Sequence, residues 1–216
     1  MRIKKQFIKK NSFSQEEISK KSGIMPKKPH YDIIPKKDNK KEDNMRISIP
    51  QNNIKKFKEA FIYILNKVGA KVNVGQTVLY KILYFIDFNY YELYEEQLMG
   101  LKYIKNTYGP TPIDFAKLIK QMQKDGDCEE IRTKYFNCEQ TKYLPKRTAI
   151  LAEISAQEIK HIDETLKRYS DKSAKELSEI SHKDIPWLIA KNGKVIDYES
   201  VFYRTEETSM RIYENK

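Results

Sequence analysis

The sequence predicts a mainly helical α+β fold, in which a long central helix is packed by several helices and by a small β-hairpin or sheet. The first observation is the segment 78–88, where nine of eleven residues are apolar or aromatic. The second is the recurrence of apolar residues at 3- and 4-residue steps in other segments, which is typical of amphipathic helices. The third is the change to strand-forming residues bounded by turn residues in 101–108 and 128–144, which favours strands.

The central helix is expected to run from about Val74 to Leu98. Asn73 is placed to cap its start, and Gln76 follows three residues later, where a capping-box side chain reaches back. Gly100 lies just beyond the far end, where a helix stop is expected. A helix of this length is roughly 36 Å long, at about 1.5 Å per residue. Polar residues interrupt the run and argue against a membrane span: Lys81, Asp87, Asn89, Glu92, Glu95 and Glu96.

The two faces of this helix differ in chemistry. One face is an ordinary core stripe made of Leu79, Ile82, Leu83, Ile86, Tyr90 and Leu93. The other is a row of phenols around one carboxylate, made of Tyr80, Tyr84, Asp87, Tyr91 and Tyr94. Two interpretations remain open. The row is a satisfied polar spot inside a helical core, or it is a half-buried ledge that receives another protein, because tyrosine is enriched at interfaces.

The segments on either side supply the other elements. A helix is expected from Asn53 to Val68, with Asn53 as its cap and Gly69 at its end. The short connection that follows should leave this helix roughly antiparallel to the central one. Residues 101–108 are predicted to form a strand, and residues 109–112 are predicted to form the turn that ends it. Thr111 would then cap a helix from Pro112 to Lys124. Residues 128–144 read as a β-hairpin or ribbon.

The C-terminal part predicts two more helices. One spans Ser155 to Tyr169, and a shorter one spans Ser173 to Ile180, with Ser173 as its cap and Glu176 three residues later. Residues 195–198 are a short strand candidate. The last dozen residues are polar and are expected to be frayed. We therefore divide the chain into a basic tail and linker at 1–50, a folded domain at 51–205 and a polar C-terminal tail at 206–216.

The positive charge is concentrated in the tail. The chain has a net charge of +11, and residues 1–50 hold 14 Lys and Arg against 6 Asp and Glu, a net of +8. Residues 51–216 hold 27 against 24, so the folded part is nearly balanced. A domain that reads duplex DNA usually carries its basic stripe on the folded surface. Nucleic acid is therefore not an expected partner, except through residues 1–50.

A short piece of the tail has a DNA-binding pattern. Residues 14–24 are similar to the first helix and turn of a helix-turn-helix repressor. A recognition helix must follow such a piece, but Pro26 and Pro29 stand where that helix would form, and proline breaks helices. The recognition helix is missing, so a DNA-binding role for this segment remains an alternative only.

Cysteine usage and the N-terminus indicate the compartment. Cys128 and Cys138 form neither a disulfide framework nor a CxxC pair, and they read as free thiols in a reducing cytoplasm. No apolar core of a signal peptide follows the basic N-terminus. The expected location is therefore the cytoplasm, without a membrane. The richness in Lys, Asn, Ile and Tyr is typical of an AT-rich bacterial or phage genome.

The sequence shows no catalytic or metal-binding constellation. It has no glycine-rich phosphate loop, no HExxH and no GxSxG, and His30, His161 and His182 are scattered. We therefore expect no enzymatic activity, no metal and no cofactor. His182 and Trp187 are the most suggestive pair. They either link helices and fill the core, or Trp187 and nearby tyrosines anchor a protein–protein contact.

Four ordered motifs resemble a known family. They are KILYFID at 81–87, GLKY at 100–103, YGPTP at 108–112, and LSEISH at 177–182 followed by Pro186-Trp187. Together, over about residues 54–204, they resemble the Panacea, or SocA-like, antitoxin domain. The resemblance implies an antitoxin of a bacterial or prophage toxin–antitoxin pair, which neutralises a toxic protein by direct binding. It also nominates residues that bind the toxin or support the binding surface: Tyr84, Asp87, Tyr91, Tyr108, Pro110, His182 and Trp187.

The same resemblance leaves the partner and the mode of action open. Family members pair with many unrelated toxins, including small alarmone-synthetase-like toxins that stop translation. One branch acts instead as an adaptor that hands its toxin to a cytosolic protease. N-terminal fusions to helix-turn-helix segments also occur, which keeps a DNA-binding autorepressor as an alternative through residues 1–50. A cognate toxin is the expected partner, and a homo-oligomer and a protease are further partners that the sequence allows.

Overall fold

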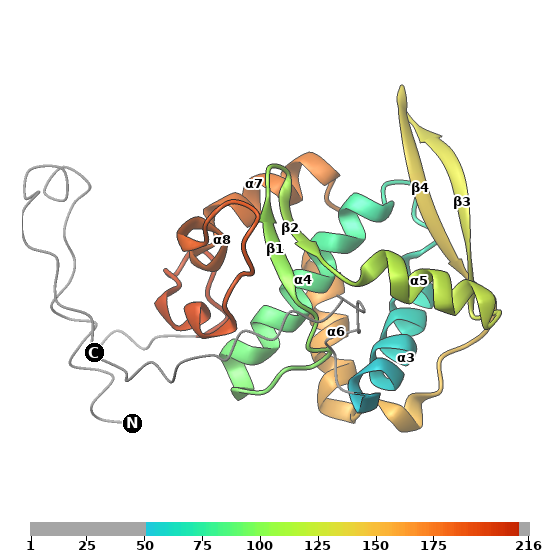
Figure 1. Ribbon diagram of the computed structural model, residues 1–216, viewed down its shortest axis with the longest axis horizontal. Coiled ribbons are helices and arrows are strands. Elements are labelled where there is room, and N and C mark those ends of the chain that lie inside the picture. The colour runs from blue at the N-terminus through green and yellow to red at the C-terminus, as the bar shows by residue number, and fades with distance from the viewer. Residues whose placement is uncertain (1–50, 212–216) are drawn as a thin grey trace, which may run out of the picture. The chain divides into compact units, whose positions relative to one another are not determined.

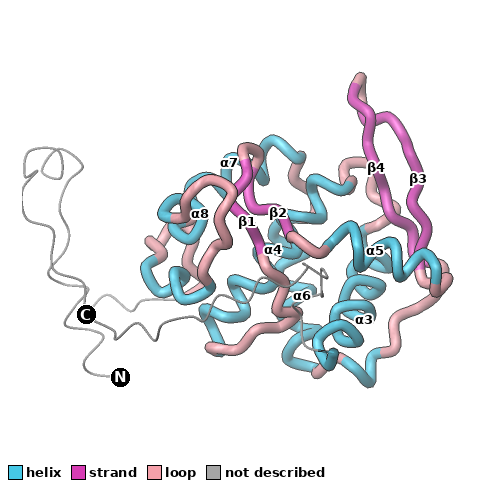
Figure 2. Tube along the Cα trace, in the orientation of Figure 1, coloured by secondary structure: helices cyan, strands magenta, loops and turns pink. Residues whose placement is uncertain are grey.

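The computed structural model describes residues 51–211, with side chains from Ile54 onward (Figure 1). The basic tail and its helix-turn-helix-like piece lie outside the described residues. The α-helices are α3 (Gln51–Val68), α4 (Gln76–Tyr94), α5 (Phe115–Lys124), α6 (Ala156–Tyr169), α7 (Ala174–Lys183) and α8 (Ile185–Ile189). The strands are β1 (Tyr103–Asn106), β2 (Gly109–Pro112), β3 (Cys128–Tyr135) and β4 (Cys138–Pro145), and two 3-10 turns are η1 (Leu151–Glu153) and η2 (Tyr198–Tyr203). The mainly helical α+β prediction is confirmed (Figure 2).

Helix α4 is the centre of the fold. Every residue from Lys81 to Tyr90 is buried. A helix that is buried on all sides needs neighbours on all sides, and here α6, α7, β2 and η2 pack around it. Tyr84 and Asp87 are both 0% exposed. The half-buried ledge is therefore the wrong interpretation for these two residues, which lie in the core.

The ends of α4 differ from the prediction. The helix begins after Gly75, which provides no side-chain cap, so the capping role expected for Asn73 is wrong. The Asn73 amide instead donates to the Ser170 carbonyl at 2.9 Å. The helix ends four residues earlier than expected, because Glu95 adopts a left-handed φ of 60° and turns the chain back. By contrast, the structure has the predicted cap of α7, where Ser173 and Glu176 form a capping box.

Residues 109–112 are a strand rather than only a turn. β2 pairs antiparallel with β1, with Tyr103 opposite Pro112 and Asn106 opposite Gly109. The helix predicted from Pro112 therefore begins only at Phe115. Two prolines hide this strand from sequence patterns, since proline removes a ladder donor. The segment predicted as a short strand at 195–198 contributes only one bridge, between Val195 and Ile104 on the other edge of β1.

The segment after η2 is ordered by a buried carboxylate. The backbone N–H of Met210 donates to Glu92 at 3.0 Å, and Arg211 donates to the Glu92 carbonyl at 2.7 Å. Thr208 is buried. The expectation of a frayed end is therefore wrong for residues 205–211, because the side chain and carbonyl of Glu92 supply hydrogen-bond partners that the sequence does not reveal.

β3 and β4 form the predicted ribbon, in register from Cys128 opposite Pro145 to Tyr135 opposite Cys138. Figure 1 shows the ribbon projecting away from the helices near α5. At its tip Phe136 is 84% exposed and has a φ of 51°, which is unfavourable for a bulky residue.

Replacing Phe136 with glycine is expected to stabilise the protein by about 0.5–1 kcal/mol, because glycine adopts positive φ without steric cost and little burial is lost. Chemical denaturation should show a higher midpoint for the glycine variant. Phe136→Ala is the matched control. It removes the same ring but keeps a Cβ at positive φ, so an equal gain in both variants would contradict this explanation.

Candidate functional site

The β1–β2 turn, the end of α7 and the start of α8 bring three of the nominated residues together. The rings of His182 and Trp187 stack with centroids 4.2 Å apart. The ammonium of Lys105 lies 4.2 Å from the Trp187 ring centroid and donates to the Leu188 carbonyl at 3.1 Å. Tyr108 is held at the turn by the Ser178 hydroxyl, which donates to its carbonyl at 3.0 Å. We call this surface the Trp187 face, made of Lys105, Tyr108, His182, Trp187, Leu188 and Ile189.

The Trp187 face exposes apolar side chains on a fixed backbone. Tyr108 is 75% exposed, Ile189 is 61% exposed and Leu188 is 47% exposed. Val195 lies beside the face, on the segment that bridges to β1, and is also exposed. A group of exposed large apolar residues differs from a single one, since such groups mark interaction sites.

Lysines outnumber carboxylates in the segments that build the face, and one of these lysines, Lys183, is paired with Glu207 at 2.7 Å. The two segments that build the face, 101–113 and 182–195, contain five lysines and one carboxylate. That carboxylate, Asp184, is 0% exposed and is bound by Arg204. Burial lowers the pKa of His182, and the charges of Lys81 and Lys105 lower it further. The imidazole is therefore neutral at pH 7, and the lysines set the charge of the face.

A close backbone approach holds the turn in place beneath the face. Gly109 has a φ of 106°, and a Cβ there would lie 2.7 Å from the Ser181 hydroxyl and 3.0 Å from Cε of Lys81. Lys81 is 2% exposed, and burial lowers its pKa to about 8. Pro110 is buried next to this contact. Glycine at 109 thus permits the β1–β2 turn to sit directly on α4 and α7.

Two of the nominated residues lie in the core below. Tyr84 donates to Asp184 at 2.8 Å. Asp87 accepts hydrogen bonds from the backbone of Met99 at 2.7 Å and from the Tyr103 hydroxyl at 3.0 Å. Burial raises the pKa of Asp87 to about 6, against the lowering effect of these donors. Both residues therefore act as scaffold.

Tyr91 lies on the side of α4 that packs against η2, where its ring centroid is 5.4 Å from that of Tyr198. The Tyr91 hydroxyl donates to Glu199, and that hydrogen bond is the main reason that its pKa is raised to about 12. The structure therefore separates the nominated residues into a surface group of Tyr108, His182 and Trp187, a supporting group of Tyr84, Asp87 and Pro110, and Tyr91.

Sequence reasoning missed the buried ion network that joins these groups. The Arg204 guanidinium binds Asp184 through two nitrogens, at 2.8 and 2.6 Å. It also reaches Asn89 at 2.8 Å and Glu92 at 2.9 Å. Arg204 lies 115 residues from Asn89 and 112 residues from Glu92 in the sequence, so no spacing rule indicates these contacts. The one sequence signal for this network is the set of polar residues in α4, because polar residues in a core helix need hydrogen-bond partners.

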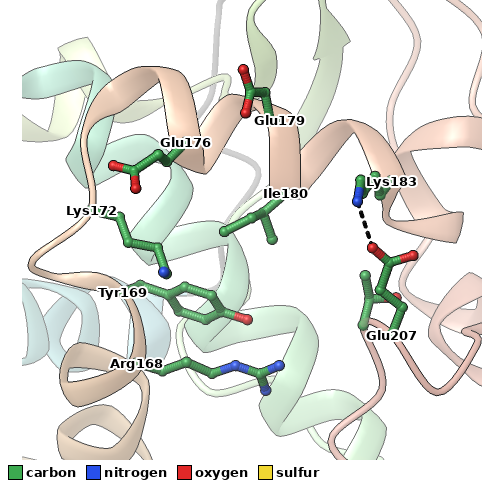
Figure 3. Close-up of a pocket in the computed structure, with 9 residues that line it drawn as sticks. Arg168, Tyr169, Lys172, Glu176, Glu179, Ile180, Lys183 and Glu207 are labelled. Atoms are coloured by element: carbon green, nitrogen blue, oxygen red, sulfur yellow. Dashed lines mark hydrogen bonds and ion pairs between the residues drawn. The ribbon is translucent and has the colours of Figure 1, made fainter.

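A surface cavity of about 470 Å³ lies between α7 and the C-terminal segment (Figure 3). It is lined by Arg168, Tyr169, Lys172, Glu176, Glu179, Ile180, Lys183, Glu207 and Thr208. Three cations and three carboxylates line it, and Lys183 is paired with Glu207 at 2.7 Å. Because the positive and negative charges are equal in number, the lining of this cavity does not favour either an anionic or a cationic ligand. Within residues 51–211, no group of three or more His, Cys, Asp or Glu side chains is placed to hold a metal ion.

Comparison of the sequence with protein-family models assigns the chain to a family. A family model described as the antitoxin SocA-like, Panacea domain matches residues 79–188, just over half of the chain. The chain belongs to the SocA-like Panacea antitoxin family. Its members have a role in toxin–antitoxin systems, and the predicted resemblance is confirmed. No curated protein and no solved structure matches the chain.

The Panacea match covers most of the Trp187 face, but Ile189 and the lysines at 191 and 194 lie beyond it. It runs from α4 to the first turn of α8 and includes Lys105, Tyr108, His182 and Trp187. Arg204 lies beyond the matched residues.

Among the helices of residues 51–211, none combines the length and the apolar character that crossing a membrane requires.

Proposed function

We propose that this Panacea protein is an antitoxin that neutralises one cognate protein toxin in the cytoplasm by direct, stoichiometric binding, without a catalytic step. The observation that carries the proposal is the family match over residues 79–188. The same residues present exposed apolar side chains on a backbone fixed by buried hydrogen bonds. A preorganised surface loses little conformational entropy on binding, which suits an inhibitor that must hold its target tightly.

Co-expression with the neighbouring gene tests this proposal. Expression of the neighbouring protein alone is expected to stop growth, and co-expression of the full-length antitoxin is expected to restore it. The two purified proteins should then elute together in a fixed ratio on gel filtration. If the neighbouring protein is harmless alone, or if growth returns with no complex, direct neutralisation is the wrong mechanism.

The half-life of the toxin separates direct binding from delivery to a protease. A stoichiometric binder leaves the toxin as stable as before or more stable, whereas an adaptor shortens its half-life. A pulse-chase measurement with and without the antitoxin gives the answer. Global translation in the same cells tests whether the toxin is of the alarmone-synthetase-like class, since such a toxin stops protein synthesis. The autorepressor alternative rests on residues 1–50, which lie outside the described residues, and stays a prediction.

A further inference from the structure

We propose that the Trp187 face is the surface that docks the toxin, and that it receives an acidic segment of the toxin that carries an apolar anchor side chain. This inference rests on the proposed function and specifies the site and the chemistry of the partner. Two independent observations lead to it. One is the apolar group at the centre of the face, and the other is the unbalanced charge around it.

The apolar group has the anatomy of a binding hot spot. Tyr108 and Ile189 are exposed, and Trp187 is half-buried between them and the core. The Trp187 ring is fixed by the stacked His182 ring and by Lys105. Aromatic residues held in one rotamer give contact area at a low entropic cost, and they dominate measured hot spots. The face therefore offers a preformed binding site for an apolar side chain of the partner.

The charge of the face specifies an acidic partner. Lys102, Lys191 and Lys194 of the face-building segments are exposed, and within residues 51–211 no ion pair engages any of the three. The one carboxylate of the two face-building segments, Asp184, is already saturated by Arg204 and Tyr84. Lysines that flank an apolar centre attract and orient an acidic segment and raise its association rate.

Charge argues against two other occupants, and the packing of Trp187 argues against a third. The tail of this chain has a net charge of +8 over residues 1–50, so it would be repelled by a lysine-rich face. A second copy of the face would be repelled for the same reason. Single-stranded RNA binds through stacking on open aromatic rings, but the ring of Trp187 is already engaged by His182 and Lys105. Exposed aliphatic side chains such as Leu188 and Ile189 also suit a protein better than a nucleic acid.

The charge part of the inference is tested with the full-length antitoxin and the protein of the neighbouring gene. The double variant Lys191→Glu/Lys194→Glu is expected to weaken the complex at least tenfold in a surface-binding assay, and to reduce the salt dependence of association. The matched control is Lys120→Glu/Lys124→Glu, which reverses two exposed charges on α5, away from the face (Figure 1). The control should bind within twofold of the wild type.

The apolar part uses single truncations. Tyr108→Ala is expected to weaken the complex tenfold or more, and Leu188→Ala a few-fold. Ile150→Ala is the control for Leu188→Ala, since the two side chains are 55% and 47% exposed. Circular dichroism and thermal unfolding should match the wild type for each variant, because the truncated side chains are exposed.

The outcomes separate the inference from the proposed function. If the wild type rescues growth and forms the complex, but the face variants bind within twofold of it, the docking surface is elsewhere while the proposed function stands. If the wild type neither rescues growth nor binds, both fail. If the face variants lose binding of a labelled oligo(U) RNA probe and keep the protein complex, the face is an RNA site and the inference is wrong.

Discussion

Replacing Arg204 with methionine is expected to lower the free energy of unfolding by about 3–5 kcal/mol, the typical cost of leaving buried charges without their partner. The Arg204 guanidinium and the carboxylates of Asp184 and Glu92 are all 0% exposed. Removal of Arg204 leaves both carboxylates in the core without their cation. Small domains are stable by only about 5–15 kcal/mol, so this one change removes a large part of the total.

Urea denaturation of the full-length protein measures the effect. Arg204→Lys should be intermediate, because one ammonium cannot replace a planar fork that binds Asp184 through two nitrogens and also reaches Asn89 and Glu92. Arg132→Met is the control, since Arg132 is exposed on β3 and its loss should change stability by less than about 0.5 kcal/mol. An Arg204→Met variant within 1 kcal/mol of the wild type would show that the network does not stabilise the fold.

The elements that the sequence predicts well are those with local signals. The predicted starts of α6 and α7 agree with the structure to one residue, and the capping box predicted at Ser173 is present, because a cap depends on side chains three residues apart. Helix α7 nevertheless runs three residues past the expected end at Ile180. The β3–β4 ribbon follows from its alternating pattern and turn residues. The errors lie where distant contacts decide. Helix α4 ends at Tyr94 rather than Leu98, and the residues that follow turn back so that the Met99 N–H can reach Asp87.

The candidate surface was predictable only in part, for a related reason. Family motifs nominated Tyr108, His182 and Trp187, which the fold does bring to one end of the molecule. The net charge of the chain gave no signal for this surface, because most of its excess lies in residues 1–50. The local excess of lysines over carboxylates arises only because the fold brings residues 101–113 next to residues 182–195. The hydrogen bond from Lys105 to the Leu188 carbonyl, across 83 residues of sequence, is one such contact.

Replacing Asp87 with alanine is expected to cost about 3 kcal/mol at pH 7, because each buried donor left without an acceptor costs about 1–3 kcal/mol. Asp87 is 0% exposed and accepts from the backbone of Met99 at 2.7 Å, the backbone of Leu101 at 3.3 Å and the hydroxyl of Tyr103 at 3.0 Å. These bonds fix the turn that leads from α4 into β1, so the β1–β2 turn and the Trp187 face should loosen with it. Hydrogen exchange at Leu101 and Tyr103 would report this loosening.

The pH dependence of the stability of the isosteric variant Asp87→Asn tests how the charge of Asp87 contributes to the stability of the fold. Burial raises the pKa of Asp87 from 3.8 to about 6, so between these values the folded state binds more protons than the unfolded state. The stability that this group contributes is therefore highest below pH 4 and falls as the pH rises to 6, by about 3 kcal/mol for a shift of about two units. Asparagine does not titrate, so the stability gap between wild type and variant should narrow from pH 4 to pH 7. A gap that widens instead would mean that the hydrogen bonds to the carboxylate outweigh its burial.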